Sequence, residues 1–295
     1  MAIHRPVARD VGLLARAPSP ALVIGAIASI QFGAAIAAKL FGRVGPGGAV
    51  LLRLFTATVV LLVLWRPRIS GHSRSELALA ALFGAVLAAM NLSFYEALDR
   101  IPLGIAVTIE FIGPLAVAIG GSRKRLDLVW AVLAAAGIVA LTRGGSQTLD
   151  GLGVALAATA GCLWGAYILL NARLGQAFAG GTGLALGMCI STLLVLPLGI
   201  FDGGRHLLEP RSLALGGAVG ILSSAIPYSF EVEALRRIAA AAFGVLMSLE
   251  PAMAALAGFL VLGQGLDVRA LLGIALVVIA SVGASRRTSE PPVAA

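Results

Sequence analysis

Two glutamates stand in the middle of long apolar segments, Glu110 in IPLGIAVTIEFIGPLAVAIGG and Glu250 in AAAAFGVLMSLEPAMAALAGFLVLG. If these segments cross a lipid bilayer, a charged carboxylate at their centre costs about 2.5 to 3.5 kcal/mol on insertion scales. Burial disfavours the charged form of a carboxyl group, so either side chain could take up and release a proton. We therefore expect Glu110 and Glu250 to form a proton or cation site. The alternative is a buried ion pair or neutral carboxyl that only fixes helix packing.

Prolines interrupt the same segments. A proline donates no hydrogen bond to the carbonyl four residues earlier, so Pro114 frees the carbonyl of Glu110. Pro251, next to Glu250, and Pro227, in the segment SSAIPYS, free carbonyls in the same way. Freed carbonyls within a membrane need a polar partner or a water-filled cavity, and transporters use them in coordination sites. The alternative is an ordinary helix kink whose carbonyl a neighbouring helix satisfies.

Further polar side chains lie inside apolar segments and could line a substrate cavity or bond across helices. They are Gln31, Lys39, Arg53, Asn91, Tyr95, Tyr167, Tyr228 and Ser248. Lys39 and Arg53 are the candidate cations, although both stand toward the ends of their predicted segments, from which long side chains can reach the membrane interface. Glu96 is a poorer candidate for a site, because Arg100 follows it by four residues and is its expected partner on a helix.

The composition indicates a membrane protein that crosses the bilayer many times. Of the 295 residues, 59% are hydrophobic and only 12% are charged, and the mean hydropathy of +0.98 exceeds what a soluble core requires. Apolar stretches of about 16 to 23 residues recur, each long enough for a transmembrane helix. We predict ten spans, at 21–40, 48–65, 76–97, 103–120, 127–142, 151–171, 182–201, 212–232, 240–262 and 269–285. Alternation of polar and apolar residues is absent, so the spans are predicted to be helices and the fold all-α.

The loop charges predict the orientation. The loops and tails on one side of the ten-span arrangement contain fourteen Lys and Arg residues, and those on the other side contain six. Cytoplasmic loops are enriched in these residues, so both termini are predicted to lie in the cytoplasm.

A repeat divides the chain into two halves of five spans. YEALDRI at Tyr95–Ile101 recurs as VEALRRI at Val232–Ile238, and Glu110 and Glu250 are 140 residues apart. A unit with an odd number of spans inserts its second copy upside down, which predicts inverted repeats. The predicted units are a cytoplasmic tail at 1–20, the first repeat at 21–143, the second at 151–285 and a cytoplasmic tail at 286–295.

Several other classes of protein receive no support. The net charge of +8 could suggest nucleic-acid binding, but the basic residues lie in short loops rather than on one face. Cys162 and Cys189 have no metal-type spacing, so neither a disulfide nor a metal site is expected. An intramembrane enzyme acting on lipids would need clustered catalytic groups, whereas His4, His72 and His206 all fall in predicted loops or tails. No cofactor is expected, and the nucleotide-binding pattern of ATP-driven pumps is absent.

The sequence resembles the drug/metabolite transporter superfamily, and within it the EamA-type threonine/homoserine exporters of the RhtA kind. The resemblance is carried by PLGIAVTIEFIGPLAVA at 102–118, ILSSAIPYSFEVEALRRI at 221–238 and FGVLMSLEPAMAALAG at 243–258. ASIQFGAAIAAKLF at 28–41 and AVLLRLF at 49–55 are similar to the first two spans of that family.

This resemblance implies a multi-pass transporter of the inner (cytoplasmic) membrane that exports small neutral amino acids or related metabolites, driven by proton exchange. The glutamates of the IEF and LEP motifs correspond to Glu110 and Glu250. A drug or other metabolite exporter of the same superfamily is the alternative. The expected partners are therefore a small-molecule substrate, protons and the lipid bilayer.

Overall fold

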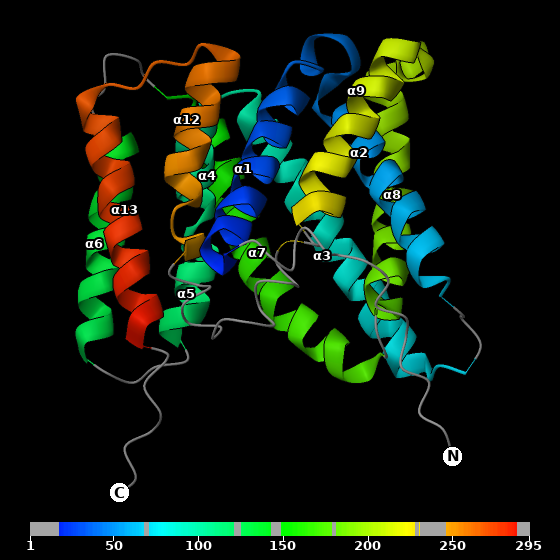
Figure 1. Ribbon diagram of the computed structural model, residues 1–295, viewed down its shortest axis with the longest axis horizontal. Helices are drawn as coiled ribbons and strands as arrows, with labels where there is room; N and C mark the ends of the chain where they lie inside the picture. Colours follow the sequence, from blue (N-terminus) through cyan, green and yellow to red (C-terminus); the bar gives the residue numbers. More distant parts are fainter. Residues whose placement is uncertain are drawn as a thin grey trace, which may run out of the picture.

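The computed structural model describes residues 18–67, 71–120, 125–142, 149–178, 181–227, 230 and 246–287. These residues form a bundle of helices in which no strand occurs (Figure 1). The helices are α1 (Ser19–Ala38), α2 (Phe41–Trp65), α3 (Arg74–Leu98), α4 (Leu103–Glu110), α5 (Ile112–Gly120), α6 (Arg125–Thr142), α7 (Gly151–Ala177), α8 (Thr182–Gly203), α9 (Pro210–Gly220), α12 (Glu250–Leu262) and α13 (Val268–Arg287). A short 3₁₀ helix, η2 (Gly204–Leu208), follows α8, and a π-helical turn, η3 (Ile221–Ala225), follows α9.

The surface of the bundle suits lipid rather than water. Among the described residues, five helical stretches are long and apolar enough to cross a membrane, namely α1, α2, α3, α7 and residues 182–208. Shorter apolar stretches occur at 103–117, 129–140, 250–262 and 268–283. Large apolar side chains point outward from the long helices, with Phe201 86% exposed and Leu64 68% exposed. A water-soluble protein rarely exposes so many large apolar side chains, so the prediction of an all-helical membrane protein is confirmed.

The largest difference from the predicted segments is at the start of α2. This helix begins at Phe41, seven residues before the predicted start at 48. Gly45 has φ +69°, a left-handed conformation that favours glycine, and the helix resumes directly after it. Pro46 follows at the first position of the resumed helix, where a missing N–H costs nothing. The glycine-rich sequence GRVGPGG is therefore a kink within a helix rather than a loop.

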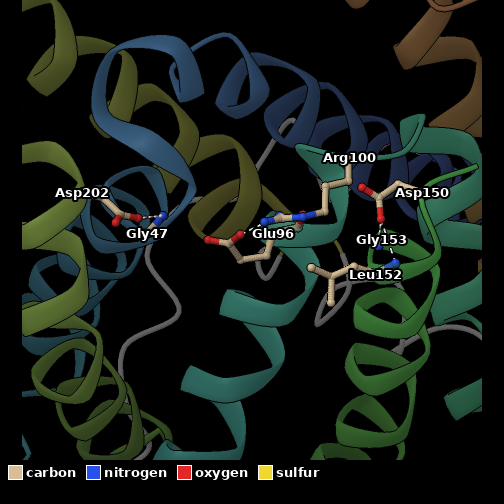
Figure 2. Close-up of polar contacts among 7 residues, drawn as sticks. All are labelled: Gly47, Glu96, Arg100, Asp150, Leu152, Gly153 and Asp202. Carbon is tan, nitrogen blue, oxygen red and sulfur yellow. Dashed lines mark hydrogen bonds and ion pairs between the residues drawn. The ribbon is translucent and has the colours of Figure 1, made fainter.

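An acidic side chain from α8, which is distant in the sequence, caps the part of α2 that begins after Gly45. The Gly47 amide donates a 3.0 Å hydrogen bond to Oδ2 of Asp202, near the end of α8 (Figure 2). A free amide in the first turn of a helix is normally capped by the residue that precedes the helix. Here the cap comes from 155 residues further along the chain.

The main helix pairs are held by close backbone contacts and by buried polar pairs. α2 packs along α8, α3 along α7, and α6 along α13. The hydroxyls of Thr58 on α2 and Thr192 on α8 lie 2.8 Å apart and are buried. A Cβ added to Gly137 of α6 would lie only 2.8 Å from the Gly273 carbonyl oxygen of α13. Small and hydroxyl-bearing residues at helix crossings are typical of membrane helix packing.

Candidate functional site

Glu110 stands at a break between two helices. It is the last residue of α4 and 9% exposed, and only Phe111, which keeps right-handed helical dihedral angles, separates it from the start of α5 at Ile112. The backbone ladder continues on both sides, because Phe111 donates to the Val107 carbonyl at 2.9 Å and Leu115 donates to the Phe111 carbonyl at 3.2 Å. The interruption is therefore confined to the Glu110 carbonyl, which Pro114 leaves without its helical donor.

The backbone of α7 covers this freed carbonyl. A Cβ added to Gly161 would lie 2.6 Å from the Glu110 carbonyl oxygen and 3.2 Å from the Glu110 Cα. One turn further, Gly113 lies even closer to the carbonyl oxygen of Gly161. Two glycines thus bring the broken helix and α7 into backbone contact, at a distance where Cα–H groups can approach a carbonyl oxygen. The Glu110 carbonyl is held by helix packing, and this packing fixes the position of the Glu110 backbone.

Glu250 stands at the start of a helix. It is the first residue of α12 and 3% exposed, and Ser248 and Leu249 before it form a turn. Pro251 lies in the first turn of α12, where no helical donor is required. The N-terminal end of a helix favours a negative charge, so this end of α12 suits an acidic side chain.

The packing of α4 against α12 puts the two glutamates at the same level of the bundle. A Cβ on Gly104 would lie 2.8 Å from the Ala255 Cα, and a Cβ on Gly258 would lie 3.5 Å from the Leu103 Cβ. The residue numbers rise on α4 as they fall on α12, so the two helices are antiparallel (Figure 1). At about 1.5 Å per residue, the same register puts Glu110 and Glu250 at about the same height along the two helices.

Arg53 lies near the middle of α2, is half-buried and contacts a buried tyrosine. The regular part of α2 runs from 46 to 65, so Arg53 is near its midpoint. Its Nη1 donates a 3.3 Å hydrogen bond to the Tyr95 hydroxyl, and its guanidinium carbon lies 5.6 Å from the centre of the Tyr95 ring. Tyr95 is 0% exposed. Because α2 starts earlier than predicted, Arg53 lies nearer the middle of its helix than the predicted segment at 48–65 indicated. Lys39, in contrast, is exposed at the end of α1.

Two further aromatic rings pack around Tyr95, the partner of Arg53. The Tyr95 ring lies 5.7 Å from the Phe41 ring and 6.0 Å from the Phe94 ring, measured between centroids. The structure thus brings Arg53 of α2 together with Tyr95 of α3.

The π-helical turn η3, which belongs to the second half of the chain, lies against α1. In η3 the Ile226 amide donates to the carbonyl of Ile221, five residues earlier, and Pro227 follows directly. The Ser29 hydroxyl of α1 donates a 2.6 Å hydrogen bond to the Leu222 carbonyl in this turn. π-helical turns recur at functional sites, so this irregular segment belongs to the candidate site.

Two buried polar atoms next to α1 have no hydrogen-bond partner among the residues that the structure describes. They are Oε1 of Gln31, whose residue is 3% exposed, and Oγ of Ser223 in the π-helical turn, whose residue is 9% exposed. Buried polar groups are normally paired, so both atoms are available to a ligand or to water. Pro227, four residues later, marks the Ser223 carbonyl in the sequence but gives no signal for the Ser223 hydroxyl.

Other predicted site residues take part in helix packing. The Asn91 amide donates to the Leu87 carbonyl, one turn earlier, at 2.8 Å. The Ser248 hydroxyl donates to that of Ser281 on α13 at 2.9 Å. The Asn91 bond therefore lies within its own helix, and the Ser248 bond joins Ser248 to α13.

The Tyr167 ring of α7 lies 5.1 Å from the Phe83 ring of α3, and Tyr228 is outside the described residues. Glu96 forms the expected ion pair with Arg100, with 2.6 Å between Oε2 and Nη1 (Figure 2). Within the described ranges, no group of three or more His, Cys, Asp or Glu residues could hold a metal ion.

Comparison with known proteins gives the family. The model of the EamA-like transporter family matches residues 151–286. A protein of Escherichia coli strain K12 named "Threonine/homoserine exporter RhtA" is 40% identical over 266 residues, which cover 90% of each chain. The protein of the same name in Salmonella typhimurium strain LT2 is 39% identical over 269 residues, covering 90% of this chain and 91% of its own. A solved crystal structure that is 19% identical matches with a TM-score of 0.58, over 92% of this chain and 99% of its own, and therefore has the same fold. The chain belongs to the EamA-like transporter family.

Proposed function

We propose that this chain exports small neutral amino acids of the threonine/homoserine class across the inner membrane, in exchange for protons that bind at Glu110 and Glu250. The observation that carries the proton coupling is that both buried glutamates stand at helix ends on the same level of the bundle. The substrate class rests on the relatives, which are named threonine/homoserine exporters and are 39% to 40% identical.

The proposed architecture is ten spans in two inverted repeats, at 21–143 and 151–285. The packing supports it, because exchanging each helix for the one five spans later maps several of the main helix contacts onto one another. The pairs α2–α8 and α6–α13 each join a helix to its own counterpart, and the contact of α3 with α7 corresponds to that of α1 with α9 and η3. The match of the family model to 151–286 supports the boundaries of the second repeat.

The proposed orientation has both termini in the cytoplasm. It rests on the excess of basic residues, fourteen to six, in the loops of that side. α1 begins and α13 ends on the lower side of the bundle as drawn in Figure 1, in agreement with an even number of spans.

The proposed transport cycle uses this pseudo-symmetry. Inverted repeats can exchange conformations, so that a site at mid-depth opens first to one side and then to the other. Protons that enter on the outer side would neutralise Glu110 and Glu250, and proton release on the inner side would restore a negatively charged site for the next substrate. The outward-open state would then bind protons more tightly, and the inward-open state would bind the amino acid more tightly. A ligand can shift a conformational equilibrium only through such a difference in affinity.

Transport in proteoliposomes tests this function. Because a proton leaves as an amino acid enters, vesicles that are acidic inside should accumulate radiolabelled L-threonine, and a protonophore should abolish the accumulation. Equal uptake with and without the gradient would refute the proton coupling. Transport of cationic dyes with no transport of threonine or homoserine would refute the substrate class.

A further inference from the structure

Arg53 is a charged residue near the middle of a membrane helix. A charged arginine near the middle of a membrane helix is costly unless something compensates its charge. Arg53 lies near the midpoint of the regular part of α2 and turns toward the fully buried Tyr95.

The described residues compensate the Arg53 charge only in part. An arginine has five N–H donors, and the Tyr95 hydroxyl accepts a hydrogen bond from Nη1 alone. Arg53 forms no ion pair with any carboxylate of the described residues. The residue is half-buried, so part of its side chain remains open.

The side chain is held in a fixed orientation. Tyr95 offers its hydroxyl and its ring face to the guanidinium group, and the Phe41 and Phe94 rings pack against Tyr95. A planar guanidinium group with free donors matches the two oxygens of a carboxylate. A group that is held in place before binding loses little entropy when the ligand arrives.

We propose that Arg53, oriented by Tyr95, binds the carboxylate of the transported amino acid. This inference rests on the proposed function and names the residue that recognises the common part of its substrates. A zwitterionic amino acid carries an ammonium group as well as a carboxylate. Arg53 on α2 provides a positive charge for the carboxylate, and Glu110 on α4, in the deprotonated state of the proposed cycle, would provide a negative charge for the ammonium group.

Ligand competition on the purified full-length protein tests the proposal. Binding of radiolabelled L-threonine is competed with L-threonine, with L-threonine amide and with L-threoninol, the last two of which lack the carboxylate. A lost hydrogen-bonded charge pair is expected to weaken binding about 10- to 100-fold. The wild-type protein should therefore prefer threonine over both analogues by about that factor.

Variants of Arg53, Tyr95 and Arg43 test whether Arg53 is the residue that causes the preference for threonine over its amide. Arg53→Gln should bind threonine only as weakly as the amide, so that the preference falls to near one, and Arg53→Lys should restore part of it. Tyr95→Phe keeps the ring and should weaken threonine binding about 2- to 10-fold, since a neutral hydrogen bond is lost. The matched control is Arg43→Gln, also on α2, whose partner is the half-exposed Glu209 at 3.4 Å. It should leave the preference unchanged.

The outcomes distinguish this proposal from the proposed function. If the wild-type protein binds neither threonine nor homoserine, the proposed substrate class is wrong. If it binds threonine and the amide equally well, no cation recognises the carboxylate and the Arg53 proposal is wrong, whether or not any variant folds. An unchanged preference in a folded Arg53→Gln protein would also overturn the proposal while leaving the transport function intact.

Discussion

The backbone of Gly161 on α7 lies directly against the carbonyl of Glu110 on α4, so that a Cβ added to Gly161 would sit 2.6 Å from that oxygen. The contact occurs where Pro114 removes the helical donor of the same carbonyl. The broken helix and the glycine therefore form one packing unit, which determines where the Glu110 side chain can lie.

Substitution of Gly161 should disturb this unit. Gly161→Ala forces the Glu110 backbone or α7 to shift, and overpacking of this kind is expected to lower the free energy of unfolding by about 1 to 3 kcal/mol. The matched control is Gly175→Ala on the same helix, where an added Cβ meets nothing within 4 Å. That change should be neutral or stabilise the protein by up to about 1 kcal/mol, because alanine is the better helix former.

Thermal unfolding in detergent measures both variants. The melting temperature should fall for Gly161→Ala and hold or rise for Gly175→Ala. If the two variants melt together, the contact between Gly161 and Glu110 has no energetic importance.

The cap that Asp202 provides for α2 should contribute measurable stability (Figure 2). Asp202→Ala removes the acceptor of the Gly47 amide, and the loss of an N-terminal cap costs about 0.5 to 2 kcal/mol. Asp202→Asn keeps a side-chain oxygen and should cost much less. Chemical or thermal unfolding of the two variants gives the comparison, and equal losses would mean that the carboxylate charge, not the cap, is what matters.

The loop glutamate Glu209 should make stability depend on pH. Its hydrogen bond with His206, 2.6 Å from Nδ1 to Oε1, lowers the pKa of Glu209, and the nearby Arg43 adds to this effect. A carboxyl whose pKa is lower in the folded state stabilises the fold above its unfolded pKa of about 4.3. The contribution is lost as pH falls through the lower, folded pKa.

Glu209→Gln keeps the size of the side chain but cannot titrate. The difference in melting temperature between wild type and this variant should be largest near neutral pH and should vanish in the acid range below about pH 4.3. A difference that stays constant from pH 7 to pH 3 would contradict this account of Glu209.

Local sequence patterns were sufficient for the helices but not for their partners. Hydropathy and length gave the segments, and Pro114 marked the position at which α4 ends and α5 begins. The kink at Gly45 was missed, because GRVGPGG has the composition of a loop while its glycine and proline allow a helix to resume. The predicted segment therefore began at 48, with Arg53 near its end, whereas Arg53 lies near the middle of the regular part of α2.

Contacts between distant parts of the chain leave no local signal. Asp202 is 155 residues from Gly47, and the acidic residue looks like an ordinary loop position. The spacing of Gly161 and Gly165 indicates close packing, but nothing in it names Gly113 and Glu110 as the partners. The partner of Arg53 was hidden for the same reason, since Tyr95 is 42 residues away.

The central claim is that Glu110 and Glu250 couple transport to protons, and uptake of L-threonine by proteoliposomes with an acidic interior tests it most directly. Glu110→Gln and Glu250→Gln remove the proton site while keeping the size of each side chain. Glu96→Gln, at a residue paired with Arg100, is the control. With equal amounts of folded protein in the vesicles, we expect both central variants to lose the uptake that the gradient drives and the control to keep it. Gradient-driven uptake at the wild-type rate in both central variants would contradict the claim.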